Sequence, residues 1–234
     1  MIQIPKNFMG KPIAGSLEKV LTNGGTPPNI ESHNTSTVTV NNESGYIYIP
    51  SIGIYMAKEK TFHGKNWTQC HQALHEQNLR MPTIPQFIAF VNYLKSSPQG
   101  TNDASAQEIE KILDDILTVR NPWRAEWLDA KFTKQNNQLY VNYNHTIPMN
   151  GNIICEKQPL EICLMEDGYS DVFHPNRQGF PMAKLSQGQG GLCFWYPRKD
   201  RVAWFLVGSR VVLDCYRRPD YADASLGVRA SFFG

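Results

Sequence analysis

The sequence predicts an α+β fold with two or three helices followed by an irregular antiparallel β region. Three observations support this class. Apolar residues recur at helical spacing in three stretches between residues 67 and 117. After about residue 145 the predicted elements become short, and Gly and Pro separate them. Charged residues make up only 19% of the 234 residues, so the surface must be largely Asn, Gln, Ser, Thr, Gly and Pro, as in loop-rich folds.

The first 44 residues differ in composition from the rest of the chain. They are rich in Gly, Pro, Asn, Ser and Thr, with Gly-Gly-Thr-Pro-Pro at residues 24–28. We predict an arm or linker over 1–44 that stays mobile or attaches the protein to a larger assembly. The folded domain is expected to span 45–234, and the aromatic and β-branched residues between Tyr46 and Ile54 predict that it begins with a strand.

Three helices are predicted from periodicity and capping signals, over residues 67–79, 84–94 and 106–117. Thr83 with Gln86 and Ser105 with Glu108 have capping-box spacing at the start of the second and third helices. A hairpin is predicted from strands 127–132 and 139–143 around a turn at 135–137. Further strands are predicted over 202–207, 211–216 and 226–232, with Gly208-Ser209 as a tight turn.

The charge pattern argues against several classes of partner. The net charge is +2 without clustered Lys and Arg, which does not predict nucleic-acid binding. No apolar run reaches membrane-spanning length, so no membrane insertion is expected. The first residues lack a basic segment followed by an apolar one, so no signal peptide is predicted. We therefore expect cytoplasmic synthesis, with display on a virion or cell surface as part of a larger assembly.

The residues that could bind a metal form no complete ligand set. His71 and His75 are four residues apart on a predicted helix, with Glu76 next to them, but no third ligand is evident. The acidic residues around Gly168 (Glu166, Asp167 and Asp171) lack the ligand order of a calcium loop and are expected to cap turns. The sequence thus predicts no metal site, no cofactor and no catalytic residue.

The five cysteines are an odd number at irregular spacing, without a Cys-x-x-Cys pair. We expect buried, reduced thiols, although the sequence leaves open a disulfide between Cys193 and Cys215. A nucleophile and base formed by one of these two cysteines with His145 or His174 has no supporting motif.

The stretch 201–224 is the most informative part of the chain. On its second predicted strand Asp214, Tyr216 and Arg218 share one face, and Trp204 and Leu206 share a face on the strand before. Trp, Tyr and Arg dominate binding hot spots, which suggests a binding surface. The alternative is that the large residues of this stretch are core. The binding-surface interpretation predicts that these five side chains are accessible and lie together.

The same stretch contains motifs that resemble a known family. Val-Ala-x-Phe-x-x-Gly-Ser at 202–209, Leu-x-Cys-x-Arg-x-Pro at 213–219 and Ser-Leu-Gly-Val-Arg at 225–229 are similar to variable proteins of diversity-generating retroelements. Glu-Trp-Leu-Asp-Ala at 126–130, Tyr-Asn-His at 143–145 and Cys-Leu-Met-Glu-Asp at 163–167 resemble archaeal or archaeal-virus members. The resemblance extends from about Tyr46 to the last residue and implies a C-type lectin-like fold of the formylglycine-generating-enzyme-like subgroup.

The resemblance also implies that mutagenesis at adenines rewrites chosen codons, mostly Asn codons. Such codons cannot yield Lys, Glu, Gln, Met or Trp, and none of these five residue types occurs from Leu206 to Ser225. Trp204 departs from this pattern, so its position is either invariant or diversified from another codon. The variable region is expected at about 198–224, and Ala224, where relatives have Ser, is a further candidate for diversification.

The family pattern divides the positions of this region into scaffold and diversified residues. The implied scaffold positions are Phe205, Ser209, Cys215, Arg217, Pro219 and Leu226 to Arg229. The implied ligand-binding positions are Trp204, Leu206, Gly208, Arg210, Val211, Asp214, Tyr216, Arg218, Asp220, Tyr221 and Asp223.

The resulting hypothesis is a non-enzymatic protein that displays a hypervariable surface to an unidentified macromolecular or surface ligand, most simply a protein. One alternative is an enzyme of the formylglycine-generating or sulfatase-modifying type, whose copper-dependent site of paired cysteines has no match in this sequence. The other is a calcium-dependent sugar lectin, whose Glu-Pro-Asn and Trp-Asn-Asp signatures are missing.

Overall fold

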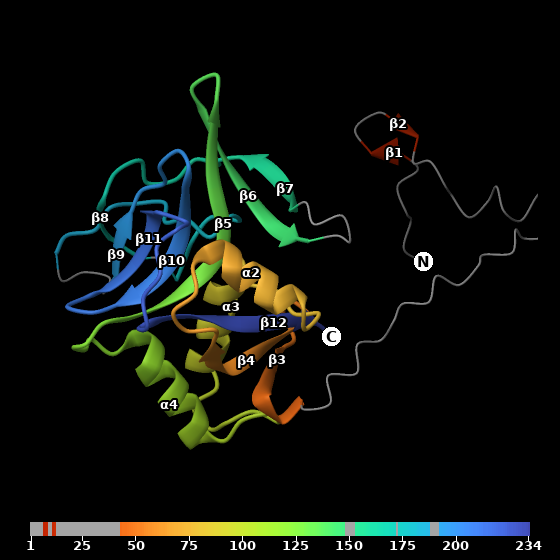
Figure 1. The fold of residues 1–234 in the computed structure, drawn as a ribbon, viewed down its shortest axis with the longest axis vertical. Helices are drawn as coiled ribbons and strands as arrows, with labels where there is room; N and C mark the ends of the chain where they lie inside the picture. The colour runs from red at the N-terminus through yellow and green to blue at the C-terminus, as the bar shows by residue number, and fades with distance from the viewer. Residues whose placement is uncertain (1–6, 9–10, 13–42, 148–152, 172, 188–191) are drawn as a thin grey trace, which may run out of the picture. The chain divides into compact units, whose positions relative to one another are not determined.

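The computed structural model of the protein describes residues 7–8, 11–12, 43–147, 153–171, 173–187 and 192–234 (Figure 1). The contacts within the chain divide it into Met1–Thr39 and Val40–Gly234. In the first unit, strands β1 (Asn7–Phe8) and β2 (Lys11–Pro12) pair in antiparallel fashion. The rest of the predicted arm, up to residue 42, lies outside the described residues. In the second unit, a short 3-10 turn over Glu43–Gly45 comes directly before the first strand.

All three predicted helices are confirmed. They are α2 (Trp67–His75), α3 (Ile84–Lys95) and α4 (Ala106–Leu117). The predicted capping boxes of α3 and α4 form, and Asn66 with Gln69 makes a third one at the start of α2. The first helix ends at His75, four residues before the predicted end at Leu79. Within the described residues no helix is both long enough and apolar enough to cross a membrane.

The second unit contains a mixed sheet of ten strands. Its strands are β3 (Tyr46–Ile49), β4 (Ile54–Thr61), β5 (Arg124–Gln135), β6 (Gln138–Thr146), β7 (Ile154–Pro159), β8 (Gly168–Ser170), β9 (Leu192–Trp195), β10 (Arg201–Val207), β11 (Val211–Arg217) and β12 (Leu226–Phe233). The order is β3-β4-β12-β5-β10-β11-β9-β8, and β6 pairs with both β5 and β7. The predicted α+β class is correct. The prediction of a purely antiparallel β region is wrong, because β12 pairs parallel with β5 and β11 pairs parallel with β9.

Two predicted strand segments differ in extent from those observed. The single strand predicted near residues 46–54 is a hairpin, because a turn with Gly53 at φ +64° lets β4 return along β3. The β5–β6 hairpin is longer than predicted and extends away from the rest of the domain (Figure 1). Its turn residues Asn136 and Asn137 both have positive φ, as two-residue hairpin turns require.

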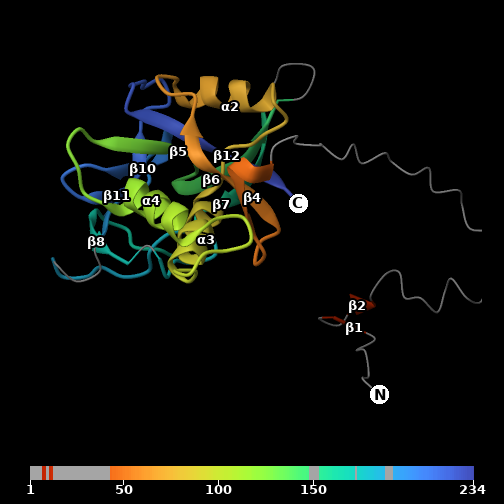
Figure 2. The same cartoon turned by 90° about the horizontal axis from the view of Figure 1, so that it is seen from below.

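The sheet buries a separate hydrophobic cluster on each face. Helices α3 and α4 cover one face, where Phe87 packs against Phe205 with ring centroids 5.0 Å apart. Helix α2 lies on the other side (Figure 2), where Trp67, Trp127 and Trp204 belong to the second cluster. Strand alternation explains the division, because successive side chains of β10 point to opposite faces.

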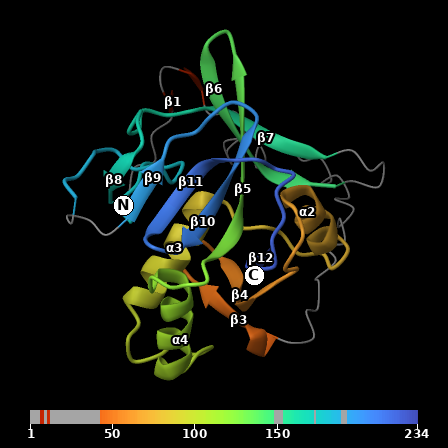
Figure 3. The same ribbon diagram turned by 60° about the vertical axis from the view of Figure 1, so that its left-hand side comes forward.

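Strand β12 lies inside the sheet, between β4 and β5 (Figure 3). Its Arg229 is 1% exposed and makes a two-pronged ion pair with Glu126 of β5, with N–O distances of 2.9 and 3.0 Å. The same guanidinium donates to the backbone carbonyls of Ala57 and Lys58 on β4. One side chain from the Gly-Val-Arg motif therefore links three neighbouring strands.

Candidate functional site

The predicted binding positions on β10 and β11 do not form one accessible cluster. Of the five side chains expected to be exposed together, Trp204 and Asp214 are buried, at 2% and 0% exposure. Leu206 and Tyr216 are half-buried and Arg218 is exposed. The accessibility prediction is thus wrong for Trp204 and Asp214 and correct for the other three.

Trp204 and Asp214 are buried because they are partners. They face each other in the β10–β11 register, and the Trp204 indole N–H donates to Asp214 Oδ2 at 2.7 Å. The Arg217 guanidinium covers the Trp204 ring at 4.0 Å, and the rings of Trp123 and Tyr221 lie beside it. Trp204 therefore lies beneath the accessible side chains of β10 and β11 and is not itself available to a ligand.

The buried Asp214 carboxylate has three polar partners: the Trp204 indole, the Tyr216 backbone N–H and the Arg217 guanidinium. Its Oδ1 accepts from the Tyr216 backbone N–H at 2.9 Å, and its Oδ2 lies 3.2 Å from Arg217 Nη2. Burial nevertheless raises the pKa of the Asp214 carboxyl above its usual value, against the lowering effect of these bonds. Replacing Asp214 would therefore leave both Trp204 and Arg217 without a polar partner.

Two more of the predicted positions are buried for different reasons. Val211 belongs to the cluster beneath α3 and α4, on the opposite face of the sheet. Gly208 has little room for a side chain, because an added Cβ would lie 3.2 Å from the Trp123 Cβ. The other seven of the eleven predicted positions are at least partly accessible. They are Leu206, Arg210, Tyr216, Arg218, Asp220, Tyr221 and Asp223.

The accessible positions lie on a framework whose side chains are mostly buried. Of the predicted scaffold positions, Phe205, Cys215 and the run 226–229 are buried, Arg217 and Pro219 are half-buried, and Ser209 is exposed. After β11, backbone bonds hold the loop, from Trp67 N–H to the Pro219 carbonyl and from Gly64 N–H to the Asp223 carbonyl, both 3.2 Å long. These backbone bonds help to set the path of the loop, together with the Asp223 side chain, which accepts from the Ser225 backbone N–H.

Two residues that the sequence did not single out extend the surface. Trp195 of β9 stacks on Tyr216, with ring centroids 5.1 Å apart and an interplanar angle of 17°, and Arg198 lies over the Tyr216 ring at 4.6 Å. Trp195 comes next to Tyr216 because β9 pairs parallel with β11, and no local sequence pattern reports that pairing. Arg218 and Asp220 form an exposed ion pair beyond it.

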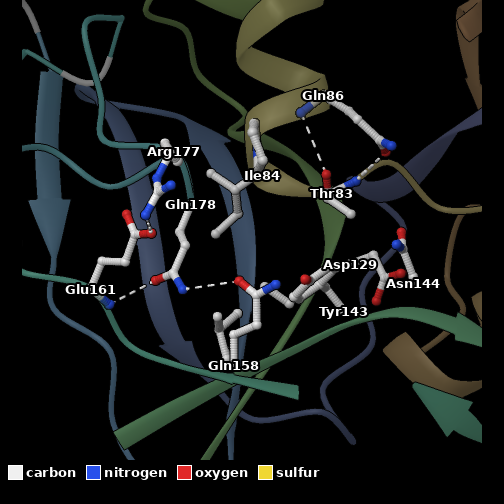
Figure 4. Close-up of a pocket in the computed structure, with 13 residues that line it drawn as sticks. Thr83, Ile84, Gln86, Asp129, Tyr143, Asn144, Gln158, Glu161, Arg177 and Gln178 are labelled. Carbon is white, nitrogen blue, oxygen red and sulfur yellow. Dashed lines mark hydrogen bonds and ion pairs between the residues drawn. The ribbon is translucent and has the colours of Figure 1, made fainter. Parts of the chain in front are cut away.

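A separate cavity of about 490 Å³ lies between the start of α3, strands β5 to β7, and the residues Glu161, Arg177 and Gln178 (Figure 4). Its lining is rich in amide side chains, namely Gln86, Asn144, Gln158 and Gln178. Gln178 accepts from the Glu161 backbone N–H at 2.9 Å and donates to the Pro159 carbonyl, so the cavity wall is fixed by its own hydrogen bonds. None of the eleven predicted binding positions lines this cavity.

His71, Asp129 and His145 meet beside this cavity, although the sequence suggested no such group. They come from α2, β5 and β6, are 4%, 2% and 7% exposed, and place their ligand atoms within 4.8 Å of one another. His145 Nδ1 and the His145 backbone N–H both contact the Asp129 carboxylate. Burial lowers the pKa of His71 to about 4, and this outweighs the opposing effect of Asp129.

The metal candidates proposed from sequence are not brought together. On α2, His71 is buried and His75 is exposed, so these two histidines do not form a joint site. In the acidic loop, Glu166 pairs with Lys184, Asp167 with Arg198 and Asp171 with His174. The expectation that the loop carboxylates cap turns is confirmed for Asp171, which accepts from the Phe173 backbone N–H.

All five cysteines are free, so Cys193 and Cys215 form no disulfide in the structure. The prediction of buried thiols is correct for Cys70, Cys163, Cys193 and Cys215, whereas Cys155 is exposed. Burial raises the pKa of the Cys215 thiol well above its usual range, which disfavours the reactive thiolate.

The comparisons with known proteins give no relative. No protein-family model matches the chain, and neither a curated protein nor a solved structure matches it significantly.

Proposed function

We propose that this chain is a ligand-binding protein of the kind diversified by retroelements, with a C-type lectin-like domain that displays a hypervariable surface. The observation that carries the proposal is the difference in burial between two groups of positions within residues 204–229. Most framework positions are buried, whereas seven of the eleven positions assigned to diversification are accessible. The absence of Lys, Glu, Gln, Met and Trp from 206–225 agrees with rewriting of Asn codons.

The chemistry of the accessible surface favours a macromolecular ligand. Tyr216 stacked on Trp195 offers a broad aromatic face, and Arg198 and Arg218 add charge at its side. Such rigid aromatic and guanidinium groups supply most of the binding energy at protein interfaces. We propose a protein on a cell or virion surface as the simplest ligand, with the domain displayed from a larger assembly.

A pair of libraries tests the proposal directly. One library randomises the seven accessible positions, and the matched control library randomises the four buried ones: Trp204, Gly208, Val211 and Asp214. We expect most members of the first library to resist proteolysis as the parent does, since accessible positions tolerate substitution better than buried ones. Most members of the control library should be cleaved.

Selection against two unrelated target proteins then tests binding. We expect the first library to yield a distinct binder for each target, with the same unfolding midpoint as the parent. If both libraries lost folded members equally, the segment would be ordinary core and the proposal would fail. A near-identical template repeat and a reverse transcriptase gene next to this gene would support the diversification part independently.

A further inference from the structure

The buried group of His71, Asp129 and His145 contains an atom that the fold leaves without a partner. His71 Nε2 has no hydrogen-bond partner among the described residues, although its side chain is only 3% exposed. Asp129 Oδ1 lies 3.6 Å away, beyond hydrogen-bonding distance. A buried polar atom without a partner is destabilising, so native proteins keep few of them, and a bound ion is one recurring reason for those that remain.

The surroundings of the three residues hold them in place. The Trp67 ring packs edge-on against the rings of His71 and His145, with centroids 4.2 and 4.9 Å away. The Trp67 indole N–H donates to the Leu128 carbonyl at 3.0 Å, which fixes α2 on β5. Asp129 Oδ2 accepts from the His145 backbone N–H at 2.9 Å, so the carboxylate orientation is also set. The three residues are therefore held close together before anything binds, which favours a metal site.

We propose that His71 Nε2, His145 Nδ1 and Asp129 Oδ1 form a binding site for a divalent transition-metal ion of the zinc class. Two imidazole nitrogens and a carboxylate oxygen suit zinc, whereas calcium and magnesium prefer oxygen ligands throughout. Ligands on a tetrahedral zinc ion lie about 3.3 Å apart, given metal–ligand distances of about 2.0–2.2 Å. The 3.6 Å between His71 Nε2 and Asp129 Oδ1 is close to this value.

Binding changes the contact between His145 and Asp129. In the structure His145 Nδ1 and Asp129 Oδ1 are in hydrogen-bond contact. The ion takes the place of the hydrogen between them, the two atoms separate, and the neutral imidazole carries its proton on Nε2 instead. Three protein ligands leave one position for water, as in open zinc sites.

The proposed site lies next to a cavity and connects three elements of the domain. Asp129 is among the residues that line the 490 Å³ cavity and a small adjoining recess, so an ion in the cavity would lie next to the buried group. The ion would join α2 to β5 and β6. Because the first residue of α2 is bonded to the Pro219 carbonyl, metal binding would also brace the scaffold beneath the variable segment.

The test uses the full chain carrying Cys155→Ser, because this exposed thiol could bind zinc by itself. The protein is stripped with a chelator and titrated with zinc, and the bound metal and the thermal midpoint are measured. We expect one zinc per chain and a rise in the midpoint. We also expect cobalt to give the visible absorption bands of a four-coordinate site.

The decisive variant is His71→Phe, compared with His75→Ala as a matched control on the same helix. Phenylalanine keeps the packing against Trp67 and removes the unpartnered nitrogen, so the metal-free variant should remain folded. Its zinc affinity should fall more than about 100-fold, since changes in outer-shell partners alone cost 10–100-fold. The exposed His75→Ala variant should bind zinc as the parent does.

Two outcomes would overturn the assignment: no stoichiometric zinc binding by the parent, or equal zinc affinity of His71→Phe and His75→Ala. If His71→Phe does not fold, nitrogen NMR of the parent decides instead. Zinc must then shift the imidazole resonances of His71 and His145 and leave those of His75 and His174 unchanged, and the reverse pattern would place the ion elsewhere.

Discussion

At the scale of single residues, the outer face of β10 and β11 contains both fixed and replaceable side chains. Trp204 and Asp214 bond to each other under the Arg217 guanidinium, whereas Arg218 and Asp220 pair at the exposed end of the loop. The buried pair cannot change without losing packing and a hydrogen bond together. The exposed pair can change at little cost, because surface ion pairs contribute little to stability.

The first prediction compares these two pairs. Trp204→Ala should lower the free energy of unfolding by about 3–5 kcal/mol, because it leaves a cavity and an unpaired Asp214. Arg218→Ala should change it by no more than about 0.5 kcal/mol. Urea denaturation of both variants measures the difference. Equal losses of unfolding free energy would mean that Trp204 is not part of the packed core.

The second prediction concerns pH. Burial raises the pKa of Asp214 in the folded state above its ordinary value of 3.8, so the folded state holds this proton more tightly than the unfolded state. The resulting stabilisation is present below pH 3.8 and is lost as the pH rises through the folded-state pKa. The stability of the parent relative to Asp214→Asn should therefore fall as the pH increases from 3.8, in urea melts at each pH.

Asp220→Asn is the control for this pH dependence. The Arg218 guanidinium lowers the pKa of the exposed Asp220, so its contribution has the opposite sign and is lost as the pH falls. If the parent gained stability over Asp214→Asn with rising pH, the ionised Asp214–Arg217 contact would outweigh the cost of burial.

The burial of the candidate site residues was only partly predictable from the sequence, for a physical reason. Alternation placed Trp204, Leu206, Asp214 and Tyr216 correctly on one face, but it cannot tell whether another element covers that face. The covering groups here, such as Trp123 and Arg217, come from a distant loop and from the end of β11. The group of His71, Asp129 and His145 was missed because its members come from three separate elements. Motif spacing detects only residues that are close together in the sequence.

At the scale of elements, local signals predicted the helices and failed for the short strands. Capping boxes at Thr83 and Ser105 marked two helix starts to the residue, since these signals act within one turn. Strands β7, β8 and β9 were not predicted. Their pairing depends on partners elsewhere in the sheet, and β7 has six exposed residues and thus no burial pattern to detect.

The third prediction tests one capping box. Ser105→Ala should reduce the free energy of unfolding by about 1 kcal/mol, because the Glu108 backbone N–H loses its acceptor at the first turn of α4. Gln107→Ala, at an exposed position two residues after Ser105, serves as the control and should change stability little. Chemical denaturation of both variants measures the change in the free energy of unfolding. An equal effect of both substitutions would show that the Ser105 cap does not stabilise the helix.

The fourth prediction tests the link between strands. Arg229→Met should cost about 3–5 kcal/mol, because it leaves the Glu126 carboxylate buried without its partner. The double variant Glu126→Leu with Arg229→Met should be more stable than Arg229→Met alone, since it removes the unpaired charge. Denaturant melts of the three proteins test this, and a less stable double variant would show that the loss comes from packing alone.

At the scale of the whole second unit, the two faces of the sheet differ in what covers them. Helices α3 and α4 cover one face, and the accessible side chains of β10, β11 and the following loop belong to the other. The class α+β and the order of most elements followed from periodicity. The strand order did not, because β12 joins β4 and β5 from the far end of the chain, and such pairing leaves no local signature.

The interior position of β12 has a consequence for biosynthesis. A ribosome makes residues 198–224 before it makes β12, and the sheet cannot close between β4 and β5 until residues 226–233 have emerged. A premature stop codon or frameshift within 198–224 would remove this strand together with Arg229. We expect such products to remain unfolded and to be cleared by proteases, so an intact reading frame through this segment is a condition for folding.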